Sequence, residues 1–297
     1  MADSDIARIL RSDGPALSGD LLLKLQESGL SAEAARKRLS RGSADVAKLK
    51  GLVFPKGARF FYHVDDFGSE RYWAALVDAI DVASPAYSAA IGALRAHGGI
   101  VPRQYFPIVS GAPIRQRKQI GSDTVLSRLT AVGLLEELVI HDVAYVSLGA
   151  NGWFGGPISG WKNRLFVQEI MLLAVADWAR KLSMVSFNSV AIRNLDGELP
   201  KFGTHAFDLC GPSYLQPMVR RGSGGGPKPG FLVCDAFVGE IDEAGVASFL
   251  RKCETSKALR NLSPFLPILL AGRFSAEAFN LARSKGVVTA TPGILFG

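Results

Sequence analysis

An acidic residue inside an otherwise apolar segment is the feature that most restricts how this chain can fold. Residues 230–241 read GFLVCDAFVGEI, which is typical of a buried strand that turns into a helix, and Asp235 lies in its middle. Asp208 has a similar setting in THAFDLCGPSYL, residues 204–215. An unpaired charge in such a strand would cost several kcal/mol. Each carboxylate therefore needs a partner, such as a basic side chain, a backbone group or a cation.

The segments around these two acids alternate between helical and strand patterns. Helices are expected at residues 163–182, 242–261 and 275–286, and strands at residues 185–194, 204–215, 230–239, 265–274 and 287–297. The later strands are apolar throughout, which favours a sheet covered on both faces. Residues 160–297 are therefore predicted to form an α/β domain with a mixed sheet.

This order of helices and strands resembles the restriction-endonuclease-like fold, whose enzymes cleave phosphodiesters with Mg²⁺. The resemblance covers residues 160–297 and implies a catalytic set of Glu169, Asp208, Asp235 and one lysine. Asp208 and Asp235 would be the metal ligands, because Mg²⁺ prefers carboxylate oxygens. The family places its lysine two residues after the last acid, where this chain has Phe237. Members sometimes take the lysine from the following helix, where Lys252 and Lys257 are available.

The same residues also have purely structural interpretations. Glu169 can be a polar position on a helix, between Val167 and Ile170. Asp208 and Asp235 can cap neighbouring backbone groups or pair with an arginine. The missing lysine at Phe237 counts against catalysis, so a nuclease-like domain that no longer cuts is the preferred interpretation.

The first 150 residues have a different pattern. Helices are expected at residues 5–12, 16–29 and 31–51, followed by two strands within 52–63 around a turn at residues 55–57. Helix, helix, helix and hairpin is the order of a winged helix-turn-helix, which predicts one such α+β unit over residues 1–66. A linking helix at residues 65–80, helices at 84–99 and 122–138 and a strand at 139–149 predict a second unit within residues 67–150.

Basic segments of the chain are separated by an acidic one, residues 63–100, which hold 2 basic and 5 acidic residues. The chain has 34 Lys and Arg against 27 Asp and Glu, a net charge of +7, and residues 1–62 hold 11 basic and 7 acidic residues. A basic helix that fits the major groove is typical of DNA recognition. The residues predicted to contact double-stranded DNA are Arg36, Lys37, Arg38 and Arg41 on the third helix, Lys56 and Arg59 in the hairpin, and Arg115, Arg117 and Lys118 in the second unit.

We therefore expect a DNA-binding protein with tandem winged helices and a non-cutting nuclease-like domain used for DNA contact, dimerisation or partner binding. Such fusions resemble regulators and accessory factors of mobile elements or defence systems. It would need no cofactor, and its partners would be DNA, a second copy of the chain or another protein. The alternative is a Mg²⁺-dependent DNA endonuclease that its winged helices direct to a site, and a third interpretation is an interaction scaffold.

Other classes of protein are disfavoured by the sequence. The longest apolar runs fall well short of the roughly 18–20 residues that a membrane span needs, and the first residues lack the pattern of a secretory signal. A cytoplasmic location is expected. Cys210, Cys234 and Cys253 have no zinc-ligand spacing and are expected to be small buried residues.

Overall fold

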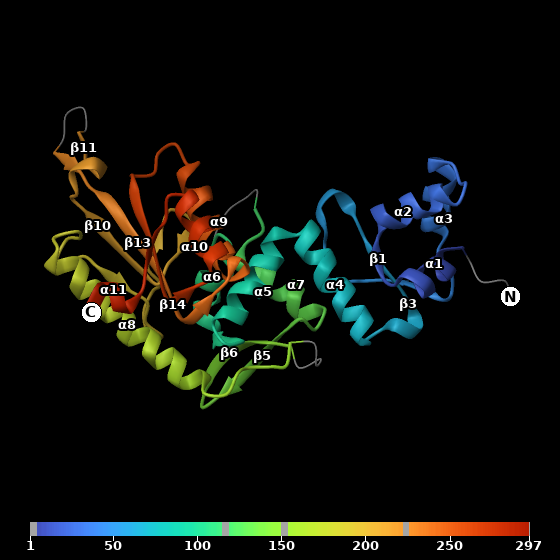
Figure 1. Ribbon diagram of the computed structural model, residues 1–297, viewed down its shortest axis with the longest axis horizontal. Coiled ribbons are helices and arrows are strands. Elements are labelled where there is room, and N and C mark those ends of the chain that lie inside the picture. The colour runs from blue at the N-terminus through green and yellow to red at the C-terminus, as the bar shows by residue number, and fades with distance from the viewer. Residues whose placement is uncertain (1–4, 115–118, 150–153, 222–225, 297) are drawn as a thin grey trace. The chain divides into compact units, whose positions relative to one another are not determined.

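The computed structural model describes residues 5–114, 119–149, 154–221 and 226–296 (Figure 1). The chain forms two compact units, which we consider separately. The N-terminal unit comprises Met1–Ser88, Ser127–Leu135 and Gly149–Gly155, and the C-terminal unit comprises Ala89–Leu126, Glu136–Leu148 and Gly156–Gly297.

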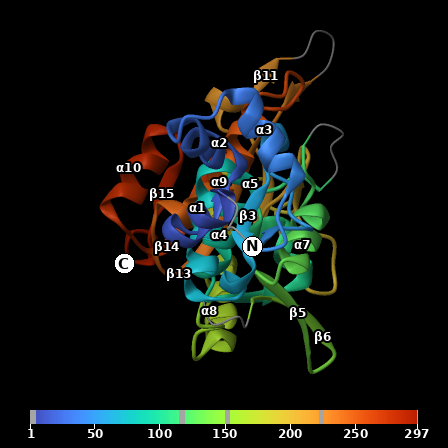
Figure 2. The same cartoon turned by 90° about the vertical axis from the view of Figure 1, so that its right-hand side faces the viewer.

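Residues 5–63 form three helices and a small sheet. In chain order the elements are α1 (Asp5–Asp13), β1 (Ala16–Leu17), α2 (Ser18–Glu27), α3 (Ala32–Arg41), β2 (Val46–Lys48) and β3 (Phe60–His63). The strands pair antiparallel in the order β1-β3-β2, and the three helices lie close to β3 in both views (Figures 1 and 2). One apolar side of each helix supplies the core of this sheet and helix cluster, which contains Ile6, Leu10, Leu21, Leu25, Ala35, Leu39 and Phe61. The turns η1 (Pro55–Gly57) and η2 (Val64–Asp66) and the helix α4 (Glu70–Ala83) complete this part of the chain.

The first strand of the hairpin was predicted wrongly. The sequence predicts a third helix that continues to residue 51 and a first hairpin strand after it. In the structure α3 ends at Arg41, because Gly42 takes a left-handed φ of 69° that stops the helix. Residues Val46–Lys48 then pair with β3. Leu52 and Phe54 are buried without joining the sheet, so their apolar character reflects packing rather than strand pairing.

The next run of the chain repeats this order of elements. It consists of α5 (Pro85–Ala96), β4 (Ile100–Pro102), η3 (Arg103–Tyr105), α6 (Phe106–Val109), α7 (Ser122–Ala131), β5 (Leu135–Ile140) and β6 (Val143–Leu148). The strands have the order β4-β6-β5, which is again first, third, second in the chain.

Here too one helix was predicted too long. The sequence predicts that the second helix of this unit continues to residue 138 and that one strand follows it. Instead α7 ends at Ala131, Gly133 takes a φ of 76°, and residues 135–148 form a hairpin. His141 and Asp142 make its turn with φ values of 49° and 64°, a conformation typical of a two-residue hairpin turn.

A five-stranded mixed sheet organises the C-terminal half, as predicted. Its order is β15-β14-β13-β10-β7, where the pairs β7/β10 and β10/β13 are antiparallel and β13/β14 and β14/β15 are parallel. The strands are β7 (Ala191–Ile192), β10 (Leu209–Ser213), β13 (Gly230–Ile241), β14 (Phe265–Phe274) and β15 (Val288–Ala290). The helices are α8 (Trp161–Lys181), α9 (Glu243–Lys257), α10 (Ala276–Ser284) and α11 (Pro292–Phe296). Short pieces lie between β7 and β13, namely β8 (Lys201–Phe202), β9 (His205–Ala206), η4 (Gln216–Met218), β11 (Arg220–Arg221) and β12 (Pro227–Lys228).

Two apolar layers cover the faces of this sheet. Leu232, Cys234 and Ala236 of β13 pack with α8, whereas Val233 and Phe237 pack with α9 and α10. The alternation is the ordinary consequence of successive side chains on a strand pointing to opposite faces. Asp235 is two residues away from both Val233 and Phe237, so its side chain lies on the same face of the sheet, toward α9.

Several strands are shorter than the sequence indicated. The strand expected over residues 185–194 is only Ala191–Ile192, and the one expected over residues 204–215 is interrupted between β9 and β10. Asp208 lies in that interruption. The last expected strand is β15, and its tail continues as α11. Cys210, Cys234 and Cys253 are free and buried, as predicted.

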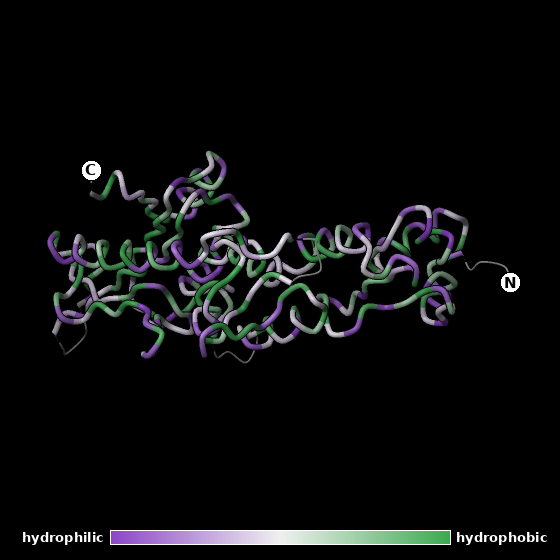
Figure 3. The backbone as a smooth tube through the Cα atoms, turned by 90° about the horizontal axis from the view of Figure 1, so that it is seen from below, coloured by the Kyte–Doolittle hydropathy of each residue, from purple (hydrophilic) through white to green (hydrophobic). Residues whose placement is uncertain are grey.

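No single helix among the described residues is long and apolar enough to cross a membrane. Hydrophilic residues interrupt the hydrophobic ones along the helices (Figure 3).

Close packing of α5 on α9 in the C-terminal unit depends on Gly92. A Cβ atom at this position would lie 2.6 Å from the carbonyl oxygen of Ala244. We expect Gly92→Ala to lower the free energy of unfolding by about 1–3 kcal/mol, because overpacking outweighs the gain in helix propensity. Gly19 in α2 is the matched control, since its Cβ would meet nothing within 4 Å, and Gly19→Ala should stabilise the protein by about 0.5–1 kcal/mol. Urea unfolding measures both, and equal effects of the two changes would contradict this packing.

Candidate functional site

Asp235 and Lys252 form a buried ion pair between the sheet and the helix that covers it. Asp235 lies in β13, and Lys252 lies in α9, a helix that begins where Asp242 accepts a hydrogen bond from Gly245 N. The Lys252 ammonium donates to Asp235 Oδ2 and, at 2.9 Å, to the Ala206 carbonyl oxygen. It also lies 4.4 Å from the ring centroid of Phe207. Because the cation faces a carboxylate, a carbonyl and a π face, its burial is compensated.

A second buried pair joins Asp208 to Arg193. Arg193 Nε lies 2.7 Å from Asp208 Oδ1, and the guanidinium stacks on Tyr105 with 4.1 Å from Cζ to the ring centroid. The Nε contact is out of line for a hydrogen bond, and Nη2 has no hydrogen-bond partner among the described residues. Opposite charge at short range therefore holds this pair together more than directed hydrogen bonding does.

Each of the two carboxylates also accepts a hydrogen bond from the backbone of the segment that carries the other acid. Asp208 N donates to Asp235 Oδ1 at 3.1 Å, and Ala236 N donates to Asp208 Oδ2 at 2.8 Å. These bonds bring the two carboxylates together where the regular ladder of β10 and β13 stops. We call Arg193, Asp208, Asp235 and Lys252 the charge quartet. Its four residues are between 0% and 6% exposed.

Burial affects the protonation of the groups in and around the charge quartet. It raises the pKa of the Asp235 carboxyl to about 6, while the Lys252 charge acts in the opposite direction. Burial lowers the pKa of His97 to about 4, so this imidazole is neutral near pH 7. His97 Nδ1 lies 2.8 Å from the Ala93 carbonyl oxygen, and Gln168 Nε2 lies 3.3 Å from His97 Nε2. Gln168 also donates to the Ala236 carbonyl oxygen, which links α8 to the strand that carries Asp235.

The predicted catalytic residues lie in two places. Asp208, Asp235 and Lys252 converge in the charge quartet. Glu169 is exposed on α8 and lines a 460 Å³ hollow that Arg193 and Tyr105 also line. Its neighbour Gln168 reaches β13, as does Arg164, which donates to the Val238 carbonyl oxygen.

Lys257 and Phe237, the other two positions considered for the catalytic lysine, lie outside the charge quartet. Lys257, the other lysine considered, is exposed and donates to the Lys285 carbonyl oxygen at 2.7 Å. Phe237 is buried, with its ring centroid 4.4 Å from that of His97. Arg193 was missed by sequence reasoning, and its only signal was a basic residue at the end of a predicted strand.

The charge quartet does not fit a divalent cation. Each carboxylate already faces a cation of the chain itself, and both are closed off from solvent. No group of three or more His, Cys, Asp or Glu side chains that could hold a metal ion is present among the described residues. A metal would have to displace Arg193 or Lys252, leaving that cation buried without its partner.

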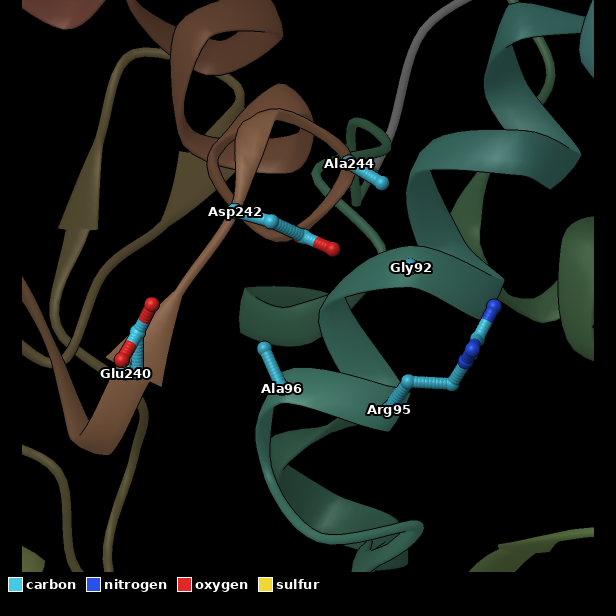
Figure 4. Close-up of a pocket in the computed structure, with 6 residues that line it drawn as sticks. All are labelled: Gly92, Arg95, Ala96, Glu240, Asp242 and Ala244. Carbon is cyan, nitrogen blue, oxygen red and sulfur yellow. The ribbon is translucent and has the colours of Figure 1, made fainter. Parts of the chain in front are cut away.

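The 350 Å³ hollow between α5 and the β13–α9 connection offers no convergent site either. Arg95, Glu240 and Asp242 line it, but Figure 4 shows the Arg95 side chain directed away from both acids. Asp242 caps α9, and Glu240 lies 3.7 Å from Arg273. Both acids therefore interact with groups near them in the fold and do not converge on the hollow.

The basic residues predicted to contact DNA are exposed where the structure describes them. Arg36, Lys37, Arg38 and Arg41 project from α3, whose opposite side buries Ala35 and Leu39. Lys37 pairs with Glu33 at 2.8 Å and Arg38 with Asp5 at 2.9 Å. Neither Arg36 nor Arg41 has an ion pair within the described part of the chain. Lys56 and Arg59 are exposed between β2 and β3, whereas Arg115, Arg117 and Lys118 lie outside the described residues.

Searches against protein-family models, curated proteins and solved structures find no match to this chain.

Removing the Lys252 ammonium tests the energetics of the charge quartet. We expect Lys252→Met to lower the free energy of unfolding by about 3–5 kcal/mol, because Asp235 is left as a buried charge without its main partner. Lys257→Met on the same helix is the matched control and should change it by less than about 0.5 kcal/mol. Urea unfolding gives both values.

The double variant Asp235→Asn/Lys252→Met should be more stable than Lys252→Met alone, since no charge is then stranded. A double variant less stable than either single variant would contradict the ion-pair interpretation.

Proposed function

We propose that the protein binds double-stranded DNA through two winged helices and carries a restriction-endonuclease-like domain that does not cut. The observation that carries the DNA-binding part is α3, which is the third helix of its group and exposes four basic residues outside its buried face. A helix with this charge placement fits the phosphate-lined major groove.

The arrangement of strands supports two winged-helix units. Each run of the chain has a helix, a strand, a helical turn or helix, a third helix and two strands. In each sheet the last strand lies between the other two, as β1-β3-β2 and β4-β6-β5. This is the order that a wing formed between the second and third strands requires.

The element order of the C-terminal half supports the nuclease-like assignment. Its principal elements are α8, β7, β10, β13, α9, β14, α10 and β15, which is the helix, three strands, helix, strand, helix, strand order of the resemblance. The two acids, Asp235 on β13 and Asp208 directly before β10, converge, as a shared phosphate-cleaving ancestry requires.

The charges around those acids support a domain that has lost catalysis. Two acids and two bases neutralise one another, and burial withholds all four from a DNA phosphate. The domain then serves DNA contact, dimerisation or partner binding, as in a regulator or accessory factor. One observation favours the alternative of a DNA endonuclease: Lys252 reaches Asp235 from the following helix, which is where a replacement for the lysine missing at Phe237 would come from.

Removing two unpaired charges from α3 tests the DNA-binding proposal. We expect Arg36→Gln/Arg41→Gln to weaken binding to a 30-base-pair duplex of mixed sequence at least tenfold. The slope of log affinity against log salt should fall by about 2, because two phosphate contacts are lost. Fluorescence anisotropy at several salt concentrations measures both. The control Lys181→Gln/Lys201→Gln makes the same charge change on exposed residues of the C-terminal unit, and an equal loss in both variants would mean that α3 is no recognition helix.

Incubation with supercoiled plasmid and Mg²⁺ or Mn²⁺ separates the two candidate functions. We expect no nicked or linear product from the intact chain. Cleavage that disappears in Asp235→Asn would establish the endonuclease instead. Glu169→Gln provides a second variant on an exposed position, in case Asp235→Asn fails to fold.

A further inference from the structure

The helix α8 is apolar on two sides, although only one of them packs on the sheet. The buried side comprises Gln168, Met171, Leu172, Val175, Ala176 and Ala179. On the other side three large apolar side chains are exposed, Phe166 to 65%, Ile170 to 51% and Leu173 to 61%. We call these three residues the outer stripe. An exposed apolar stripe on a helix whose opposite side is already buried is typical of an interaction surface.

The outer stripe is symmetric about its own midpoint. This midpoint lies between Glu169 and Ile170, because Phe166 comes three residues before Glu169 and Leu173 comes three residues after Ile170. Two copies of α8 that pack antiparallel about the midpoint therefore bring Phe166 of each copy against Leu173 of the other. Reciprocal contacts of this kind are what a two-fold dimer requires.

Charges near the two ends of α8 complement each other in the same arrangement. Lys162 lies four residues before Phe166, and Asp177 lies four residues after Leu173. Residues four apart share one side of a helix, so both charges continue the outer stripe. Antiparallel packing about the midpoint sets Lys162 of one copy opposite Asp177 of the other, and it does so twice. Parallel packing would instead set like charges against each other, so the complementarity favours an antiparallel second copy.

Both of these charges are available for such a contact. Lys162 is exposed with its Nζ 5.5 Å from the Trp161 ring centroid, and it forms no ion pair within the described part of the chain. The Asp177 side chain is 63% exposed. Its contacts are with neighbours on the same helix, at 3.6 Å from Arg180 and 3.9 Å from Lys181. A contact across an interface therefore displaces little.

A hollow beside the outer stripe fits the opposing aromatic ring. Its volume is 460 Å³, and its apolar lining consists of Tyr105, Leu172, Leu173, Ile192 and Leu195. In the antiparallel arrangement the Phe166 ring of the second copy arrives at Leu173 and fills this hollow. Glu169, which also lines it, is exposed, so its carboxylate belongs to the polar rim that surrounds the apolar centre of an interface.

We propose that two copies of this chain associate through α8, packed antiparallel about a two-fold axis that passes between Glu169 and Ile170. Phe166 of each copy occupies the hollow beside Leu173 of the other. This assignment rests on the proposed function only in that it specifies the dimerisation given there as one role of the C-terminal domain.

Sedimentation velocity of the full chain tests the association. We expect a monomer–dimer equilibrium with a Kd of about 1–100 μM, as for other small interfaces. Phe166→Glu should raise the Kd at least tenfold, because it introduces an acid into the apolar contact twice per dimer. Val139→Glu is the matched control, since Val139 is 76% exposed on β5 of the same unit, and should leave the Kd unchanged. A chain that stays monomeric above that range, or a dimer insensitive to Phe166→Glu, would overturn the proposal.

Charge reversal tests the antiparallel register. At low salt Lys162→Glu and Asp177→Lys should each raise the Kd at least tenfold, because each change sets like charges against each other at both ends of the interface. An equimolar mixture of the two variants should associate about as tightly as the unaltered chain, since opposite charges then face each other again. A mixture that associates no better than either variant alone would overturn the proposed packing. Far-ultraviolet circular dichroism confirms that each variant is folded.

These measurements contain no DNA, so the interface and the DNA-binding proposal fail separately. A monomeric chain that binds the 30-base-pair duplex would overturn the interface and leave the DNA-binding proposal standing. A dimer that forms through α8 without affinity for the duplex would do the reverse.

Discussion

The pairing of buried charges stabilises the packing of helix on sheet in the C-terminal half of this protein. A carboxylate in the middle of β13 is tolerated only because α9 delivers an ammonium to it, and the pair fixes the helix against the sheet at one point. Asp208, directly before the neighbouring strand β10, is paired in the same way with Arg193. The reciprocal hydrogen bonds between the two acids and the facing backbones then replace the sheet ladder where it ends. Four charges that would each be costly alone become a structural joint between three strands and one helix.

That joint sets limits on chemistry. A hydrolytic site needs charges that can rearrange around a phosphate, whereas these are already satisfied by one another and covered. The residue types of an active site are present, but their partners are internal. The internal pairing of these four charges is the physical basis for the proposal that the domain does not cleave DNA.

Elements with strong local signals were predictable from the sequence, whereas the bounds of short strands that depend on a partner strand were not. The long helix α8 buries residues at helical spacing, and α9 and α10 begin at the N-caps Asp242 and Ser275, which act within a few residues. By contrast, β2 and β7 are strands of two or three residues that exist because β3 and β10 offer partners. The segment Leu134–Leu138 fits a helix as well as a strand, and the left-handed Gly133 with the hairpin turn decides between them.

The candidate sites divide in the same way. Asp208 and Asp235 stood out because an acid among apolar residues demands an explanation, and Lys252 was one of two lysines on the right helix. Arg193 and Gln168 have no such local signature, since their roles arise from contacts with residues far away in the chain. The hollow that Lys48, Tyr72 and residues 131–133 line was equally hidden, because these residues meet only after folding.

The two hairpins of the N-terminal half of the chain differ in their turns, which gives the repeated units unequal tasks. Residues 49–59 carry Lys50, Lys56 and Arg59 between β2 and β3, whereas β5 and β6 are joined by only His141 and Asp142. The first of these loops carries three basic residues and no acidic one, whereas a carboxylate lies at the tip of the second. The two sheets therefore share a strand order but present opposite charge at the tips of their hairpins.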